Sequence, residues 1–434
     1  MAKRRRTLGT GTRRRRRRDF RALRWLLLGA ALLAAAAAWF VWPYWRLSGS
    51  LASDPGATPS RLYARSLRLE PGMRTSAGEL ARRLEGCGYR PAPREGLLPG
   101  TFRALPNQVA VYQRRFPSPR GWTGGGLLVV DLAGGRVRRL QYGAEEVPAA
   151  LLEPRLLASF HGPEQLDRVP VALDELPREL VQAVLAAEDD GFFEHPGLSL
   201  SGILRALWTN VSGGAVRQGG STLTQQLVKN RFLTAERTVE RKLREALLAI
   251  FVELRYDKRE ILGFYLDGIF WGRPGGVNLM GVGAAARAYF DRPAAELDLA
   301  ESALLAGIIR SPAELSPYRH PEAALARRNQ ILDRLVALRW VASERAEEAK
   351  QAPLGVRATG YGRNRAPFFA AAAAAEARRR FALESLTDAG LLLLSTLDEE
   401  EQAAAEAAVE AGLSGLAKRS QRPGLDALQG ALVS

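Results

Sequence analysis

Hydrophobic residues are concentrated in one long uncharged run near the start of the chain. Residues 25–45 contain no charged side chain, and tryptophans lie at both ends of the run. At about 1.5 Å per residue, a helix of this length crosses a hydrocarbon core of about 30 Å. The pattern therefore predicts a transmembrane helix over residues 25–45. A cleaved signal peptide is the alternative, because the alanines at 34–38 could form a small-residue cleavage site.

After this run, the hydrophobic positions change to short alternating stretches around one amphipathic segment. Residues 46–60 are rich in Gly, Ser and Pro and are predicted to be a linker. Ser76 is expected to cap the helix that follows it, and Gly134-Gly135 to form a hairpin turn. The pattern predicts a small α/β module over residues 61–145. Its predicted strands are residues 62–69, 109–116, 127–132 and 136–142, and its predicted helix is residues 76–84.

From residue 150 to about residue 340, hydrophobic positions recur at helical spacing, which predicts a mainly-α domain. An alanine-rich stretch over residues 341–385 predicts a helical connector. Residues 386–434 begin a further domain, with a predicted strand, a helix and the start of another strand at 391–396, 399–418 and 428–434. The helices predicted in the mainly-α domain are residues 179–187, 198–209, 222–230, 239–254, 258–266, 299–309 and 321–338.

The charge of the chain is concentrated at its start. The net charge is +16, and residues 1–24 hold twelve Lys or Arg against one Asp. Such a basic segment before a hydrophobic run predicts a cytoplasmic tail, with the rest of the chain outside the cytoplasm. No aromatic interleaving or zinc-finger spacing supports nucleic-acid binding. Cys87 is the only cysteine, so an intrachain disulfide is excluded.

The first candidate site is the segment Glu188-Asp189-Asp190-Gly191-Phe192-Phe193-Glu194-His195 at the end of a predicted helix. Carboxylates here lie beside two phenylalanines. Apolar surroundings raise the pKa of a carboxyl group, which makes a glutamate a useful base near neutral pH. The alternative is a solvated acidic helix end, which would explain Asp189 and Asp190 alone.

Two further motifs carry groups suited to an oxygen-rich anion. Residues 218–230 read Gln-Gly-Gly-Ser-Thr-Leu-Thr-Gln-Gln-Leu-Val-Lys-Asn, and a glycine-led helix start can hold a phosphate. Thr222, Gln226 and Lys229 are spaced to share one face of that helix. Residues 241–245 read Arg-Lys-Leu-Arg-Glu, in which Arg241 and Glu245 are one helical turn apart. A plain ion pair between these two is the alternative interpretation.

Together these motifs resemble the peptidoglycan glycosyltransferases (glycosyltransferase family 51) of class A penicillin-binding proteins. The pattern Glu-Asp-x-x-Phe-x-x-His-x-Gly matches from Glu188 onward, and residues 327–332 match a later block. Phrases at 68–72, 88–90 and 114–116 resemble the small UvrB-domain-2-like module of the 1b type. The resemblance implies a lysozyme-like α fold at 150–340. Residues 386–434 resemble the start of a transpeptidase domain, truncated before its catalytic motifs.

The resemblance also implies roles for individual residues. Glu188 would be the catalytic base, and Glu245 the second essential carboxylate. The substrate, lipid II, would be joined to a growing glycan strand by a β-1,4 link, with loss of undecaprenyl pyrophosphate. The substrate-binding residues would be Asp189, Phe192, His195, Ser221, Thr222, Gln225, Gln226, Lys229, Asn230, Arg241 and Lys242.

Several expectations follow for location, cofactors and partners. The resemblance implies a single-pass protein of the inner membrane with a periplasmic catalytic domain. It also implies an outer-membrane lipoprotein activator that docks on residues 61–145. No organic cofactor is expected. Glu245 would orient the leaving diphosphate through a divalent cation, magnesium or manganese, or through a basic side chain.

One block departs from the family pattern and keeps other functions open. Gly263, Asp267 and Gly268 stand where the family usually has Glu, Asn and Glu. Glycine weakens a helix, and two acids near the site are lost. A catalytically weak scaffold of a cell-wall complex is therefore one alternative. A lysozyme-like glycan hydrolase is the other, since two carboxylates flanking a glycan suit that chemistry.

Overall fold

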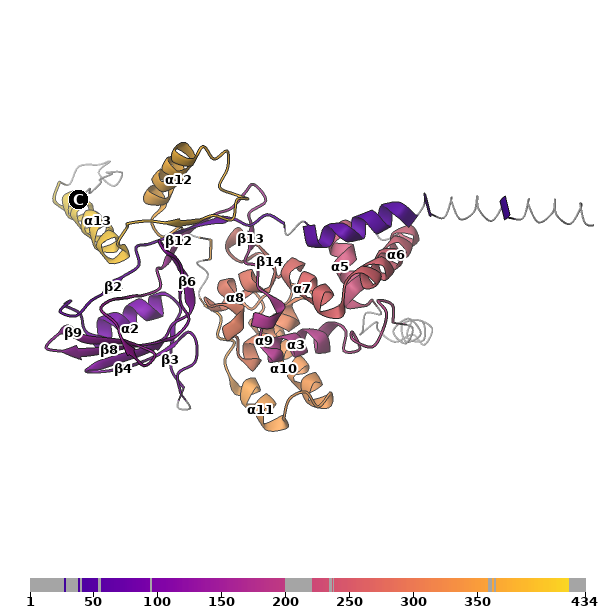
Figure 1. Cartoon of the computed structure of the whole chain (residues 1–434), viewed down its shortest axis with the longest axis horizontal. Coiled ribbons are helices and arrows are strands. Elements are labelled where there is room, and N and C mark those ends of the chain that lie inside the picture. The colour runs from indigo at the N-terminus through magenta and orange to yellow at the C-terminus, as the bar shows by residue number, and fades with distance from the viewer. Residues whose placement is uncertain are drawn as a thin grey trace, which may run out of the picture. The chain divides into compact units, whose positions relative to one another are not determined.

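The computed structural model describes residues 27–28, 38–39, 41–53, 56–93, 96–199, 221–233, 236, 238–357, 361–362 and 364–420 (Figure 1). The chain forms two compact units, each discontinuous in sequence. The first combines Met1–Pro55 with Phe192–Phe264, and the second combines Gly56–Gly191 with Tyr265–Ser434. The predicted mainly-α domain therefore contributes helices to both units.

The second unit contains a six-stranded sheet in the order β10-β9-β8-β5-β4-β3, which forms the predicted α/β module. Helix α2, Ala77–Gly86, covers it (Figure 1), and the Ser76 side chain caps α2 as predicted. Leu80 and Leu84 of this helix pack into the core of the sheet. The predicted hairpin turn is confirmed, with positive φ at both glycines between β8 and β9. The strands are β3 (Arg90–Pro91), β4 (Thr101–Leu105), β5 (Gln108–Tyr112), β8 (Leu127–Ala133), β9 (Arg136–Tyr142) and β10 (Glu145–Glu146).

Two of the predicted strands are wrong as single elements. The stretch 62–69 splits into β1, Ser60–Tyr63, and β2, Arg68–Leu69, which belong to different sheets. The stretch 109–116 likewise splits between β5 and β6. Hydrophobic alternation continues through each split, so it does not show where the backbone leaves one partner strand for another. The remaining strands are β6 (Arg115–Ser118), β7 (Gly121–Gly124), β11 (Ala150–Leu151), β12 (Leu156–Phe160), β13 (Leu166–Arg168), β14 (Asn278–Met280) and β15 (Leu392–Leu394).

Strand β1 connects distant parts of the chain. It pairs antiparallel with β12 on one side and parallel with β15 on the other. The predicted strand at 391–396 is thereby confirmed as β15. The predicted connector is helical in two pieces, α11 (Ser343–Gln351) and α12 (Pro367–Phe381), and α13 (Glu399–Ser420) follows.

A helical layer in the second unit surrounds α9, Leu299–Ile308. Every residue of α9 is buried, since α3 (Arg178–Glu188) and α10 (Pro321–Ala337) pack against it. Its start is closed by a capping box between Asp298 and Glu301. These helices confirm the predictions for the corresponding stretches. The others in this layer are α3 (Arg178–Glu188), α8 (Val282–Phe290) and α10 (Pro321–Ala337), with short 3-10 turns at η1 (Leu173–Glu175), η2 (Pro274–Gly276) and η3 (Ala294–Glu296).

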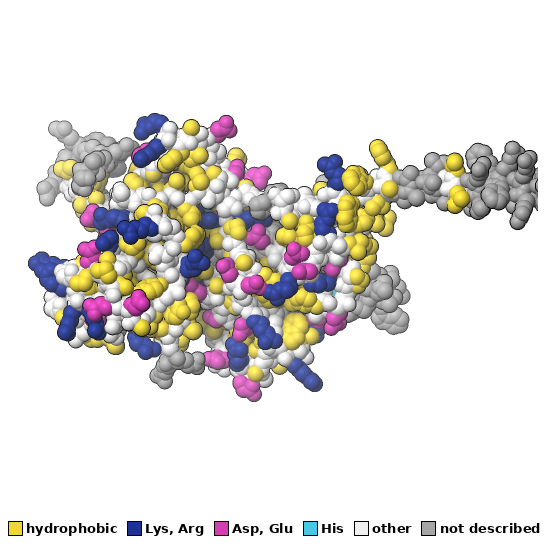
Figure 2. All heavy atoms as spheres, in the orientation of Figure 1, with side chains coloured by type: hydrophobic (Ala, Val, Ile, Leu, Met, Phe, Trp, Pro, Cys, Tyr) yellow, Lys and Arg dark blue, Asp and Glu magenta, His cyan; other side chains and the backbone are white. Residues whose placement is uncertain are grey.

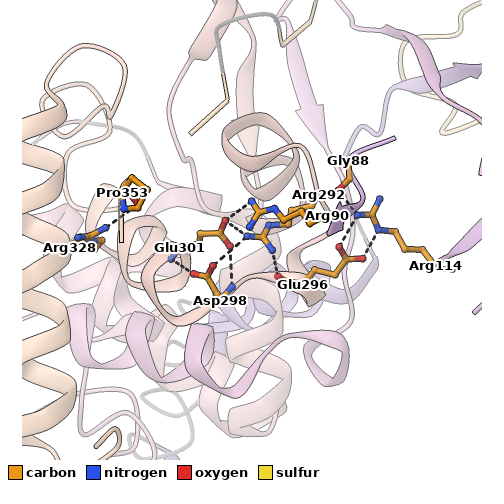
Figure 3. A network of polar contacts seen from close by, with 9 residues as sticks. All are labelled: Gly88, Arg90, Arg114, Arg292, Glu296, Asp298, Glu301, Arg328 and Pro353. Carbon is orange, nitrogen blue, oxygen red and sulfur yellow. Dashed lines mark hydrogen bonds and ion pairs between the residues drawn. The ribbon is translucent and has the colours of Figure 1, made fainter. Parts of the chain in front are cut away.

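The α/β module docks on this helical layer through buried ion pairs (Figure 3). Arg114 binds Glu296 through two nitrogens, at 2.5 and 2.8 Å, and also donates to the Cys87 and Gly88 carbonyls at 2.9 Å. Arg90 reaches Glu301, the capping residue of α9, at 2.9 Å. The start of α9 is therefore held by side chains of the small module.

The first unit is built from α5 (Leu223–Phe232), α6 (Val239–Arg255), the first part of α7 (Lys258–Gly268) and a helix over residues 41–53. The Trp45 ring lies edge-on to Phe251, with centroids 6.1 Å apart, and under the Arg255 guanidinium at 4.3 Å. Figure 2 shows hydrophobic side chains gathered where the helix of residues 41–53 and α6 lie. Trp42 and Leu254 are among the exposed members.

The predicted linker over 46–60 is wrong in its first half, because residues 46–53 continue the helix. Serines are tolerated there since their hydroxyls bond back to the preceding turn. Ser48 Oγ donates to the Trp45 carbonyl at 2.8 Å, and Ser50 Oγ to that of Leu47 at 2.9 Å. Packing against α6 outweighs the weak helix propensity of Gly and Ser.

Several predictions fall on residues outside those described. These are the basic tail at 1–24, most of the predicted transmembrane run at 25–45, most of the predicted helix at 198–209, and the strand start at 428–434. Within the described residues, no helix combines the length and apolarity that a membrane crossing requires.

Candidate active site

The first candidate catalytic residue, Glu188, ends helix α3 in the second unit. It is half-buried, and Asp189 forms the C-cap, donating its backbone N–H to the Leu185 carbonyl at 2.8 Å. Asp190 turns away to an ion pair with Arg334 of α10. Hydrophobic residues of α3 that pack on α9 fix the direction in which this helix ends. Glu188, Asp189 and Asp190 are thus consecutive in sequence but have different surroundings.

The surroundings of Glu188 include a buried phenol and a basic side chain. Burial raises the pKa of Tyr265 well above its usual value, and the nearby Glu188 and Asp189 carboxylates raise it further. Burial and then Arg310 lower the pKa of Arg327, while Glu188 acts in the opposite direction. The charge of Glu188 therefore acts on the titration of both Tyr265 and Arg327, as is common for carboxylates at functional sites.

The segment after Glu188 enters the first unit and is held by Lys258 at the start of α7. The Lys258 ammonium donates to the His195 carbonyl at 2.7 Å and to Glu253 at 2.8 Å. It also lies 4.3 Å from the centroid of the Phe192 ring, which is fully buried. Phe192 and His195 contact edge to face, with centroids 6.3 Å apart. Phe192 thus anchors the segment, and its neighbour Phe193 is exposed.

Helix α5 begins with a complete capping box. The Thr222 hydroxyl accepts from the Gln225 backbone N–H at 3.2 Å, and the Gln225 side chain accepts from the Thr222 N–H at 3.0 Å. The Thr222 hydroxyl also donates to the Gly197 carbonyl at 2.6 Å. The polar groups of Thr222 and Gln225 therefore join α5 to the His195 segment. The preceding glycines, at 219 and 220, lie outside the described residues.

Thr224 makes a second connection on the same helix. Its hydroxyl donates to Glu253 of α6, the carboxylate that also receives Lys258. Sequence reasoning missed this Thr224–Glu253–Lys258 group. The only available signal was the position of Lys258 and Glu253 close to the matched blocks.

The second candidate carboxylate, Glu245, is only 2% exposed and lies between two cations of its own helix, α6. Arg241 donates to one oxygen at 2.9 Å, and the Lys242 ammonium pairs with the other. Lys242 also donates to the Ser221 hydroxyl at 2.8 Å. The start of α5 and the start of α6 therefore meet at a cluster of positive charge organised by one buried carboxylate.

The remaining predicted binding residues lie on the outer side of α5. Lys229 and Asn230 are exposed, and Gln226 is half-buried. Glu188 and Asp189 belong to the second unit, and all other predicted site residues belong to the first. The structure thus brings Ser221, Lys242, Arg241 and Glu245 together, within one unit. The roles of the thirteen residues named in the sequence remain predictions.

The donor set around Glu245 does not suit a divalent cation. Mg²⁺ prefers oxygen ligands in an octahedral arrangement, whereas both Glu245 oxygens here face nitrogen cations. In the described part of the chain, no group of three or more His, Cys, Asp or Glu residues could hold a metal ion. Of the two options left open by the sequence, this geometry favours a basic side chain as the partner of the diphosphate.

Two protein families match parts of the chain. Residues 153–336 match the family described as "Transglycosylase", and residues 69–153 match "Bifunctional transglycosylase second domain". Penicillin-binding protein 1B of Haemophilus influenzae is 32% identical over 385 residues, which are 88% of this chain and 49% of that protein.

Other relatives give the same picture. Penicillin-binding protein 1B of Escherichia coli is 32% identical over 381 residues, which cover 85% of this chain and 44% of that protein. Penicillin-binding protein 1A of Aquifex aeolicus is 41% identical over 223 residues, or 48% of this chain and 30% of that protein. The chain spans about half the length, or less, of these relatives.

Proposed function

This chain is a member of the transglycosylase family that includes penicillin-binding proteins 1A and 1B, and we propose that it polymerises lipid II into glycan strands of the bacterial cell wall. The observation that carries the proposal is the cationic cluster at Glu245. Arg241 and Lys242 are held on a buried carboxylate, and Lys242 reaches the Ser221 hydroxyl at the start of α5. This cluster is suited to the diphosphate of a lipid-linked sugar donor.

In the proposed reaction, Glu188 takes the proton from the sugar 4-hydroxyl of the acceptor. That oxygen attacks the anomeric carbon of the donor and forms the new C–O bond. The bond from the anomeric carbon to the diphosphate breaks, and its electron pair leaves with lipid diphosphate. Because attack and departure occur on opposite faces, the configuration inverts to a β-1,4 link.

The basic residues of the first unit supply the electrostatic part of this reaction. Negative charge grows on the leaving diphosphate, so fixed cations stabilise the transition state more than the ground state. Arg241 offers a planar fork of donors, and Lys242 and Lys229 offer point charges. Glu245 holds Arg241 and Lys242 in place and is itself neutralised, so we assign it a positioning role.

The proposal extends to the surroundings of the enzyme. A lipid-linked substrate requires the catalytic domain to work at a membrane surface, and the hydrophobic run at 25–45 would supply an inner-membrane anchor with the catalytic domain in the periplasm. The module of residues 61–145 would receive an outer-membrane lipoprotein activator. These assignments rest on the sequence pattern and on the family.

Polymerisation of purified lipid II by the full chain in detergent tests the proposed activity. Glu188→Gln should lower the rate by about 10²- to 10⁴-fold, the usual contribution of a general base. Glu194→Gln is the matched control, because Glu194 lies in the same segment and is exposed. It should retain the rate of the unaltered chain.

The same experiment separates the alternatives. Cleavage of preformed glycan by the chain would favour a lysozyme-like hydrolase and contradict the proposal. Absence of both polymerisation and cleavage in the folded chain would favour a scaffold instead. This alternative is suggested by Gly263 and Gly268, which depart from the family pattern.

A further inference from the structure

A cavity of about 220 Å³ lies within the second unit, and none of the residues assigned to catalysis line it. Its walls come from the small module, from residues 153–161, from the end of α8 and from Arg357, Tyr361, Gly362 and Arg365. Seven of the lining residues are arginines. So many guanidinium groups around one cavity require negative charges to balance them.

Four of the arginines are already paired. Arg61 binds Asp167 at 2.8 Å, and Arg155 binds Glu399 at 2.7 Å. Figure 3 shows two others directed to carboxylates of the helical layer, Arg114 to Glu296 and Arg292 to Glu301.

The other three, Arg287, Arg357 and Arg365, form no ion pair with any acidic residue that the structure describes. Arg287 is half-buried, and its Nε atom is buried without a hydrogen-bond partner in the described chain. Burial lowers the pKa of Arg365, and the neighbouring Arg155 lowers it further, against the opposing influence of Glu399 and Asp291. Arg155 and Arg365 therefore repel each other.

The acidic residues that line the cavity form no ion pair with these three arginines. Asp167 is occupied by Arg61 and by the Tyr361 hydroxyl. Glu153 pairs with Arg114 at 3.7 Å; burial raises the pKa of Glu153, while the charges of Arg114 and Arg287 lower it. Asp291 is exposed at the end of α8. Arg357 and Arg365 are exposed, but Arg287 Nε is a buried donor without a partner in the described chain. Such a donor is costly, so the arrangement calls for an acceptor from outside the chain.

We propose that this cavity binds a small free oxyanion of the phosphate class, inorganic phosphate or diphosphate. Guanidinium groups donate two parallel hydrogen bonds to such oxygens, and they keep their charge at every physiological pH. The bound anion would connect Arg287 of α8 with Arg357 and Arg365 of the later segment and with Arg155. It would therefore strengthen the contact between the small module, the helical layer and the connector.

Calorimetric titration of the full chain in detergent with inorganic phosphate and with diphosphate tests this site. All variants carry Arg241→Gln as a common background, so that the cluster proposed for the donor diphosphate does not contribute. Both anions should bind and should raise the unfolding temperature, because a ligand of the native state stabilises it. Sodium chloride at the same ionic strength should do neither.

Two variants and a control locate the binding. Arg287→Gln should weaken the affinity at least tenfold, and Arg357→Gln, which changes an exposed residue and leaves the fold intact, should also weaken it. Arg319→Gln, at an exposed arginine outside the cavity, should leave affinity unchanged. Equal effects of chloride and phosphate would overturn the proposal. So would unchanged binding in Arg357→Gln, or a loss in Arg319→Gln as large as in the cavity variants. None of these results depends on the polymerisation activity.

Discussion

At the scale of single residues, burial decides which of two similar side chains is available for chemistry. Glu188 and Glu245 both belong to motifs that the sequence predicts to be functional, but Glu245 is enclosed by Arg241 and Lys242. Both oxygens of Glu245 are thus occupied by donors of its own helix, so neither is open to a sugar hydroxyl. Glu188 ends its helix half-buried, so it remains the better candidate base.

The thiol of Cys87 gives a prediction at the same scale. Burial raises the pKa of Cys87 to about 12, about three units above that of an ordinary thiol, with a further contribution from Glu153. Because the thiolate is the reactive form, its fraction at pH 8 falls roughly a thousandfold. We expect the native chain to react very slowly with Ellman's reagent at pH 8, and to react fully after unfolding in guanidinium chloride.

Since the folded pKa is raised, the reaction of the native thiol should become about tenfold faster with each pH unit and level off only near pH 12. Rapid labelling of the folded chain near neutral pH would contradict the burial of this thiol. Cys87→Ser serves as the control for labelling at other groups.

At the scale of elements, helix α7 shows how a local weakness is tolerated. It runs unbroken over Lys258–Gly268 although it contains Gly263 and ends in Gly268. Buried residues such as Ile261, Leu262 and Tyr265 hold it by packing, which offsets the poor helix propensity of glycine. The departures from the family pattern therefore do not interrupt the helix.

Replacing Gly263 by alanine should stabilise the chain. A Cβ atom at Gly263 meets no atom within 4 Å, and the residue has ordinary helical geometry. The expected gain is about 0.5–1 kcal/mol in the free energy of unfolding, because alanine loses less backbone entropy. Denaturant unfolding of the two chains side by side measures it.

Gly197→Ala provides the opposite comparison. Gly197 has φ of +81°, and a Cβ atom there would approach Glu253 Cγ to 2.7 Å. This substitution should destabilise the chain. A loss of stability in Gly263→Ala would show that α7 requires the glycine for a reason other than propensity.

At the scale of the whole molecule, the contact between the small module and the helical layer depends on paired charges. Arg114 and Glu296 are 8% and 11% exposed at the side chain. Ion pairs at the surface contribute little, but removing one partner of a buried pair leaves an uncompensated charge.

Arg114→Met should therefore lower the free energy of unfolding by about 3 kcal/mol or more. The double variant Arg114→Met with Glu296→Gln should recover part of the loss, because neither side chain is then an unpaired charge. Thermal unfolding of the four chains of this cycle gives the coupling energy. Equal stability of the single variant and the unaltered chain would show that the pair does not hold the module in place.

Much of this molecule follows from local pattern. Helical spacing of hydrophobic residues, together with capping residues, predicted α2, α3, α5, α6, α7, α9 and α10. This spacing is informative because the side of a helix that faces the core is hydrophobic and the side that faces solvent is polar. The hairpin at Gly134-Gly135 follows from the need for positive φ. The motifs around Glu188 and Arg241 likewise indicated the type of chemistry before any contact was known.

Other features depend on partners that are distant in sequence, and only the tertiary structure decided them. The Ser-rich stretch 46–53 is helical because α6 packs against it, and the strand pattern at 62–69 divides because β1 pairs with both β12 and β15. Lys258 holds the segment after Glu188 by donating to the His195 carbonyl, which is 63 positions away in the chain. Local propensity does not predict such contacts, because their free energy comes from side chains that only the fold brings together. The unpaired arginines of the cavity belong to the same class, because only the folded chain shows which charges have found a partner.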